Sequence, residues 1–183
     1  HGAFIWIKND QAFVADISAQ TDFAVIPLID YLLPRTPKNV AIGIYRYKKD
    51  FDKDKMLQIF DIFDKQKEKI CFDYLFLTNP LIQNPDTYLD TYPFIFCYEF
   101  IKLTYEYSLE KSLSLSPYRV NASKVAENLK VNPLLSAIAA TVSGVNSTSK
   151  HFLLSANNFT QSKDFIPILE IFNIPVDLKN NPN

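Results

Sequence analysis

The chain contains very little glycine. Only Gly2, Gly43 and Gly144 occur among its 183 residues, whereas glycine makes up roughly 7% of an average soluble domain. Loops that cradle phosphates need neighbouring glycines, because the backbone must approach the ligand closely and turn with positive φ. The sequence therefore excludes a P-loop and a dinucleotide-binding fingerprint. The abundance of Lys, Ile, Asn, Phe and Tyr indicates that the deficit mainly reflects an AT-rich coding sequence.

Charge and hydropathy exclude further classes of protein. The net charge is −1 and the isoelectric point is about 6.1, so the chain lacks the basic footprint of a nucleic-acid-binding protein. No stretch of about 20 apolar residues is free of charge, so we expect no membrane insertion. No basic-then-apolar leader is present, and a first residue other than Met indicates a processed or altered start.

The two cysteines, Cys71 and Cys97, are too few for a disulfide framework. Each is flanked by apolar residues, which predicts buried free thiols rather than a disulfide. Free thiols favour a reducing compartment, so we expect a cytoplasmic protein.

The first half of the sequence alternates between strand and helix patterns. Two short strands at 3–8 and 12–17, joined by a tight turn, predict a β-hairpin. Residues 22–33 have helical apolar spacing, with Asp22 placed to cap the helix. Residues 40–47 are β-branched and apolar at both odd and even positions, as in a strand that is buried on both faces of a parallel sheet.

A strong amphipathic helix is predicted over residues 52–69, with an apolar stripe at Met56, Ile59, Phe60 and Phe63. Together with a strand at 70–78 it predicts a right-handed βαβ unit. The remaining predicted elements are a loop at 79–92, helices at 93–111, 121–130 and 133–143, a strand at 151–156, a helix at 163–172 and an edge strand at 174–176.

These patterns predict a single α/β domain over residues 1–183, with 177–183 as a frayed tail. We expect the N-terminal β-hairpin to lead into a mostly parallel central sheet flanked by helices.

No motif for catalysis or metal binding stands out. His1-Gly2 superficially resembles the start of the lytic polysaccharide monooxygenases, where an N-terminal His and a second His bind copper. Those enzymes are Gly-rich β-sandwiches, whereas this sequence is poor in glycine and predicts an α/β fold. We therefore expect no copper site. Zinc-ligand spacings are absent, which favours a structural role for Cys71, Cys97 and His151. His151 and Ser155 on one strand lie too far apart for a base and its nucleophile. We therefore predict no catalytic residue, no metal and no cofactor.

A small-molecule site, if the chain has one, is expected beyond the carboxyl ends of the sheet strands. The side chains expected there are Asp16, Arg46, Asn79 and Asn157. Arg46 is one of only three arginines, and a guanidinium at a strand end can hold a carboxylate or phosphate. This crevice defines the alternative hypothesis of a small-molecule-binding protein or enzyme.

The aromatic content favours a different hypothesis. The chain has 10 Tyr and 15 Phe, and tyrosine is a frequent anchor of protein interfaces. Since catalytic side chains are scarce, we favour a non-enzymatic protein-binding module, such as an adaptor, an inhibitor or immunity-type protein, or a subunit of a complex. Its interface is predicted over residues 88–118, at Tyr88, Tyr92, Tyr98, Tyr105, Tyr107 and Tyr118.

Overall fold

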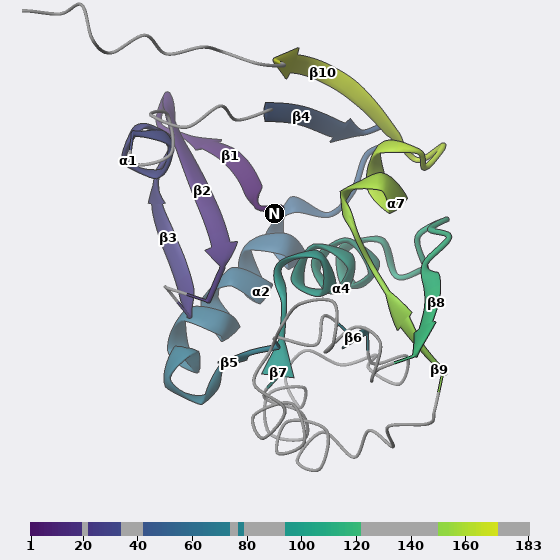
Figure 1. Cartoon of the computed structure of the whole chain (residues 1–183). Helices are drawn as coiled ribbons and strands as arrows, with labels where there is room; N and C mark the ends of the chain where they lie inside the picture. The colour runs from purple at the N-terminus through teal and green to yellow at the C-terminus, as the bar shows by residue number, and fades with distance from the viewer. Residues whose placement is uncertain (20–21, 34–41, 74–76, 79–93, 122–149, 172–183) are drawn as a thin grey trace, which may run out of the picture.

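The computed structural model describes residues 1–19, 22–33, 42–73, 77–78, 94–121 and 150–171 (Figure 1). The strands are β1 (Phe4–Lys8), β2 (Gln11–Ile17), β3 (Phe23–Pro27), β4 (Ile42–Tyr47), β5 (Cys71–Phe72), β6 (Leu77–Thr78), β7 (Phe94–Ile95), β8 (Tyr118–Asn121), β9 (Lys150–Leu153) and β10 (Phe165–Ile171). The helices are α1 (Leu28–Leu32), α2 (Lys53–Lys65), the short 3₁₀ helix η1 (Lys67–Lys69), α4 (Cys97–Leu109) and α7 (Ala156–Thr160).

The predicted N-terminal hairpin is present. Strands β1 and β2 pair antiparallel, from Lys8 opposite Gln11 to Phe4 opposite Ala15. Asn9 and Asp10 between them have φ values of 49° and 60°. A two-residue hairpin turn of type I′ requires positive φ at both positions, and Asn and Asp tolerate it well. The turn therefore fixes the register of the whole hairpin.

The helix predicted over residues 22–33 is wrong in its first half. Residues Phe23–Pro27 form β3, which pairs antiparallel with β2, and only Leu28–Leu32 are helical. The free edge of β2 offers backbone hydrogen bonds to the segment that follows it, and those bonds outweigh the weak helical period of the sequence.

Two longer helices support the sheet β1–β2–β3. The predicted stripe of α2 is confirmed, since Met56, Ile59, Phe60 and Phe63 are buried. The Asp52 side chain caps this helix by accepting hydrogen bonds from the backbone N–H groups of the second and third helical residues. Helix α4 is buried along much of its length and starts at Cys97, four residues after Pro93, where we expected the start.

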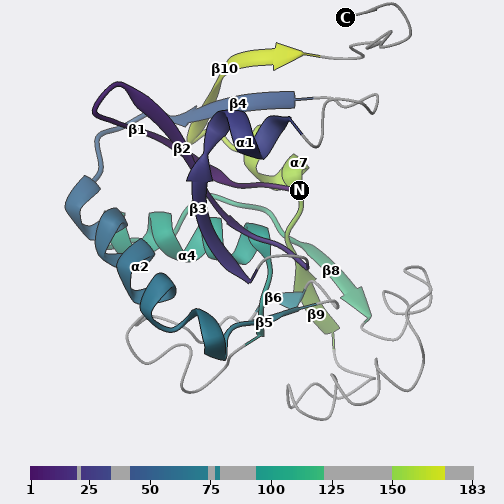
Figure 2. The same cartoon turned by 90° about the vertical axis from the view of Figure 1, so that its left-hand side faces the viewer.

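Aromatic side chains form the core between sheet and helices. The ring of Phe4 on β1 lies 5.5 Å from that of Phe60 on α2 and 5.6 Å from that of Phe100 on α4. Phe23 on β3 lies 5.6 Å from Phe100. These distances lie in the favourable range for ring pairs. Figure 2 shows α2 and α4 against the sheet they cover.

The predicted mostly parallel central sheet is wrong. The pairs within β1–β2–β3, β10–β4 and β6–β9–β8 are all antiparallel, and β5–β7 is the one parallel pair in the described part of the chain. Strand β4 pairs with β10, where the sequence predicts a helix over 163–172. The pairing shifts register between Pro167 and Leu169, as a bulge at a proline allows. The two strands form a ribbon that is not buried on both faces, since Ile166, Ile168 and Leu169 of β10 are exposed.

Several predicted elements lie outside the described residues. They are the loop at 79–92, the helices at 121–130 (apart from Asn121 in β8) and 133–143, and the edge strand at 174–176. The predicted strand at 151–156 corresponds to β9, after which α7 begins. Within the described ranges, no helix is long and apolar enough to cross a membrane.

We predict that Phe100→Ala lowers the free energy of unfolding by about 3–5 kcal/mol, because the change removes a fully buried ring from the aromatic core. Urea denaturation followed by circular dichroism measures this loss. Ile7→Ala is the control, since Ile7 is 74% exposed and should change stability by less than about 0.5 kcal/mol. Equal losses in the two variants would contradict the core described above.

Candidate active site: a Cys–His–Asp cluster beside an apolar cavity

Three side chains that are distant in sequence lie close together around the first residue of the chain. His1 precedes β1, Asp16 lies in β2 and Cys97 is the first residue of α4. His1 Nε2 lies 2.7 Å from Oδ1 of Asp16, and the Cys97 side chain lies close enough to the same imidazole to raise its pKa. The histidine therefore links a carboxylate on one side to a thiol on the other.

The hairpin register brings His1 to Asp16. Because Phe4 pairs with Ala15, extending the ladder by one step places residue 3 opposite residue 16. Side chains of alternate residues share a face, so His1 and Asp16 are diagonal neighbours on one face of the hairpin. The two-residue turn at Asn9 and Asp10 sets this geometry, since an added residue would move Asp16 to the opposite face.

The histidine carries a strongly shifted pKa. Burial lowers the pKa of His1, but the hydrogen bonds and charges of Asp16 and Cys97 raise it more, to about 10. The Asp16 side chain is 3% exposed and the His1 side chain 38% exposed. A carboxylate that holds one ring nitrogen orients the imidazole and stabilises its protonated form. Since Nε2 faces Asp16, Nδ1 is the ring nitrogen left for proton exchange with the thiol.

Cys97 occupies the N-terminus of a 13-residue helix. Phe96, the N-cap residue, provides no side-chain cap, and the first intrahelical bond runs from the Phe100 N–H to the Phe96 carbonyl. The N–H groups at a helix start have no acceptor inside the helix, and they carry its positive dipole end. A helix N-terminus and a protonated imidazole are the two features that generally activate cysteine nucleophiles.

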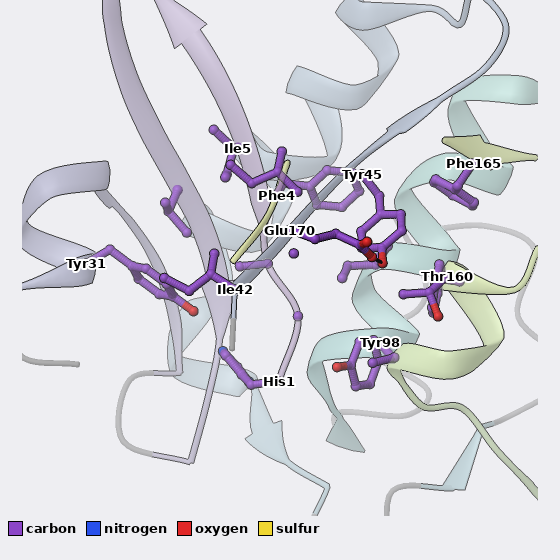
Figure 3. Close-up of a pocket in the computed structure, with 18 of the residues that line it drawn as sticks. His1, Phe4, Ile5, Tyr31, Ile42, Tyr45, Tyr98, Thr160, Phe165 and Glu170 are labelled. Carbon is purple, nitrogen blue, oxygen red and sulfur yellow. Dashed lines mark hydrogen bonds between the residues drawn. The ribbon is translucent and has the colours of Figure 1, made fainter. Parts of the chain in front are cut away.

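An apolar cavity of about 600 Å³ adjoins this cluster. His1 and Tyr98 line one end, whereas β4 and β10 contribute Ile42, Tyr45 and Glu170 (Figure 3). Cys97 is 3% exposed and does not itself line the cavity, but its hydrogen-bond partner His1 and its neighbour Tyr98 do. A reacting group would therefore approach the sulfur from the end of the cavity that these two residues mark.

Both glycines in the described part of the chain line the cavity. A Cβ on Gly2 would lie 2.6 Å from the Tyr98 ring and 2.8 Å from Ile101 Cδ1, and one on Gly43 would lie 2.7 Å from the ring of Tyr45. Such contacts are far too short for carbon atoms, so both positions need glycine for close approach. In a chain this poor in glycine, two of its three glycines therefore shape one cavity.

The residues predicted for a strand-end crevice do not come together as a set. Asp16 lies in the cluster with His1. Arg46 is exposed on β4 and Asn157 is exposed on α7, and neither lines the cavity. Asn79 lies outside the described residues. The strands described in the structure form no mostly parallel sheet whose carboxyl ends could gather these side chains.

The predicted tyrosine interface is likewise distributed. Tyr98 lines the cavity and stacks on Phe159 at 5.7 Å. Tyr105 packs against Phe4 at 5.1 Å, and burial raises its pKa to about 12. Tyr107 packs against the core, and Tyr118 is exposed on β8. Tyr88 and Tyr92 lie outside the described residues, so the interface stays a prediction.

The cysteines are free, as predicted, but they differ in environment. Cys97 is buried, whereas Cys71 on β5 is exposed, so the prediction of a buried Cys71 is wrong. His151 lies on β9, opposite Val120. In the described ranges no three His, Cys, Asp or Glu side chains are grouped so that they could hold a metal ion.

Sequence reasoning missed His1 and Cys97 as partners. His1 was weighed only as a copper ligand, and Cys97 only as a core or zinc-binding thiol. The two-residue turn contained the missing information for the histidine, because it places residues 1 and 16 on one face. For the cysteine, the necessary observation was that the helix starts at residue 97 rather than at Pro93.

Comparison with known proteins adds information on the fold alone. No protein-family model matches the chain, and no curated protein matches its sequence. The fold is similar to that in the "Crystal structure of metalloprotein yiiX from Escherichia coli O157:H7, DUF1105", with a TM-score of 0.53 and 12% identity. The match covers 93% of this chain and 82% of that one. At this identity the likeness concerns the arrangement of the backbone and no activity.

We predict that the His1 imidazole titrates near pH 10 rather than near its ordinary value of 6.5, and that Asp16→Asn lowers this pKa by removing the carboxylate charge. The chain has two histidines, so His151→Gln provides a background with a single ring to follow by NMR. A His1 titration near 6.5 in that background would contradict the ion-pair geometry.

The same shift has a defined effect on stability. Because the folded pKa lies above the unfolded value, the contribution of protonated His1 is complete below about pH 6.5 and is lost as the pH rises towards 10. We therefore expect the stability advantage of the parent chain over His1→Gln to shrink across that range. Urea denaturation at several pH values measures it, and an advantage that grows with pH would contradict the assignment.

Proposed function

We propose that this chain is a thiol-dependent acyl hydrolase, with Cys97 as nucleophile, His1 as acid and base, and Asp16 as the residue that orients His1. The observation that carries the proposal is the single imidazole that bridges a buried carboxylate and a thiol at a helix N-terminus. A nucleophile, a base and an orienting acceptor in hydrogen-bonded series make up the catalytic triad, which recurs on unrelated folds.

The first step follows from the positions of these groups. The Cys97 sulfur attacks the carbonyl carbon of an ester, thioester or amide, and its proton resides on His1. The carbonyl π electrons move to oxygen and give a tetrahedral oxyanion. When the oxyanion collapses, the bond to the leaving group breaks, and His1 gives its proton to that group. The product is a thioester between the acyl group and Cys97.

The second step restores the enzyme. His1 takes a proton from water while the water oxygen attacks the thioester carbonyl. The carbon–sulfur bond then breaks, the acid leaves, and the proton returns to the Cys97–His1 pair. Throughout the cycle Asp16 holds the ring by its contact with Nε2, which leaves Nδ1 available to the sulfur. The uncapped N–H groups at the start of α4 are the donors suited to the oxyanion.

A metal-based reaction at these residues fits the geometry poorly. The structural neighbour is described as a metalloprotein, and His, Cys and Asp all bind zinc. A tetrahedral zinc ion at roughly 2.0–2.2 Å from each ligand holds them about 3.3–3.5 Å apart. His1 Nε2 and Asp16 Oδ1 are 2.7 Å apart, an ion-pair contact that is too short for two ligands of one zinc ion. We derive no step through a metal.

The protein-binding function expected from the aromatic content remains a separate prediction. Most of the described aromatic rings fill the core or line the cavity. Among the large hydrophobic side chains that are exposed in the described ranges, Tyr118 is the one aromatic residue.

We predict that Cys97→Ala and His1→Ala each reduce the hydrolysis of an activated ester, p-nitrophenyl butyrate, by at least about a thousandfold in kcat/KM, because members of one triad act as a unit. Asp16→Asn should reduce it by at least a hundredfold. Stopped-flow absorbance of released p-nitrophenolate measures the rates. Added EDTA should not change them.

Cys71→Ser is the matched control, because Cys71 is the other free cysteine and lies exposed on a different element. This variant should retain the parent rate. Mass spectrometry after a brief reaction with iodoacetamide gives a second measurement: His1→Ala should slow alkylation of Cys97 but not of Cys71. Activity that survives Cys97→Ala would disprove the proposed function.

A further inference from the structure

We propose that the substrate is an acyl compound with a linear apolar chain, and that the 600 Å³ cavity holds this chain while its carbonyl lies beside His1 and Cys97. This inference rests on the proposed function and extends it to a class of substrate. It commits to a fatty-acyl type of chain rather than to the apolar residue of a peptide.

The composition of the cavity wall is the first argument. Among the described residues that line it, His1 and Glu170 are the only ionisable groups near neutral pH. Aliphatic side chains from β1, α1 and β4 and aromatic rings from α4 and α7 provide most of the remaining surface. A cavity of this size lies in the range that encloses small ligands, roughly 300–1,000 Å³. Such a wall rewards the burial of methylene groups and penalises polar ones.

The two charged groups lie in different parts of the lining and are both engaged. His1 faces Asp16 and Cys97. Glu170 on β10 accepts a hydrogen bond from the Tyr45 hydroxyl on β4, and this bond raises the pKa of Tyr45. The Tyr45 hydroxyl thus occupies one acceptor position of the Glu170 carboxylate. Apolar side chains such as Ile5, Ile42 and Phe165 also line the cavity (Figure 3).

The two glycines let aromatic rings pack directly against the backbone at the cavity wall. Gly2 follows His1 directly, and Gly43 lies in the β4 wall. A Cβ at either position would press on the ring of Tyr98 or Tyr45. The rings of Tyr98 and Tyr45 therefore form part of the apolar wall at these two positions.

The test is a chain-length series of p-nitrophenyl esters, from acetate through butyrate and octanoate to dodecanoate, below their critical micelle concentrations. Each methylene held in the cavity should raise kcat/KM by about threefold to fourfold, since its burial contributes about 0.8 kcal/mol. We expect octanoate to exceed acetate by at least a hundredfold. The p-nitrophenyl ester of N-acetylphenylalanine should react more slowly than octanoate.

A variant that fills the cavity tests whether the dependence of the rate on chain length arises there. Ile44 on β4 lines the cavity, so Ile44→Trp should lower the ratio of octanoate to acetate rates by at least tenfold. Ile168 on β10 is exposed and lies outside the cavity, so Ile168→Trp should leave the ratio unchanged. A second measurement is the binding of dodecanoate to Cys97→Ala protein by isothermal titration calorimetry, which Ile44→Trp should weaken by at least tenfold.

The outcomes separate the two proposals. Hydrolysis that depends on Cys97 but not on chain length, or that favours the phenylalanine ester, overturns the substrate class and leaves the hydrolase intact. No Cys97-dependent hydrolysis of any ester overturns the hydrolase. In that case, dodecanoate binding that Ile44→Trp weakens still supports the apolar-chain site, and an absence of binding overturns it.

Discussion

The contact between Phe4 and Phe100 is the constraint on which the candidate site depends. Phe4 follows His1 by three residues, and Phe100 follows Cys97 by three residues. Their rings meet edge to face at 5.6 Å, which ties the first strand of the sheet to the first turn of α4. Phe60 packs on both rings, at 5.5 Å and 5.9 Å. The separation between imidazole and thiol is therefore set by hydrophobic packing in the core, and the hydrogen bonds of the cluster only refine it.

A second constraint fixes the orientation of the imidazole, and it comes from backbone geometry. The positive φ values of Asn9 and Asp10 close the hairpin with two residues, and the resulting register places Asp16 on the face of His1. The sheet then buries the Asp16 carboxylate. A buried carboxylate is retained at such a place when a cation satisfies it, and the protonated His1 fulfils this role. The electrostatics of the site thus follow from the turn.

The sequence predicted local structure better than topology. The hairpin, the apolar stripe of α2 and a helix covering 97–109 follow from spacings within a few residues, and all three are present. The parallel sheet was wrong because the apolar run at 40–47 does not reveal which strand pairs with it. Its partner β10 contains Pro167 within an otherwise apolar segment, and such a segment was mistaken for a helix. Pairing across more than 100 residues leaves no trace in local periodicity.

Sequence motifs could not reveal the candidate site, for a related reason. Phosphate-binding loops leave dense local motifs, because consecutive residues contact one ligand. A thiol–imidazole–carboxylate series needs only one hairpin and one helix start, and here its members stand at positions 1, 16 and 97 with no fixed spacing. The scarcity of glycine argued against the first kind of site and gave no information on the second. The better indication was where the few glycines lie, since Gly2 and Gly43 both allow backbone and aromatic rings to meet at the wall of the same cavity. Glycine is rare in this chain, yet it stands at two positions of one cavity wall where a Cβ would press on a ring. The shape of that wall is therefore constrained at both positions.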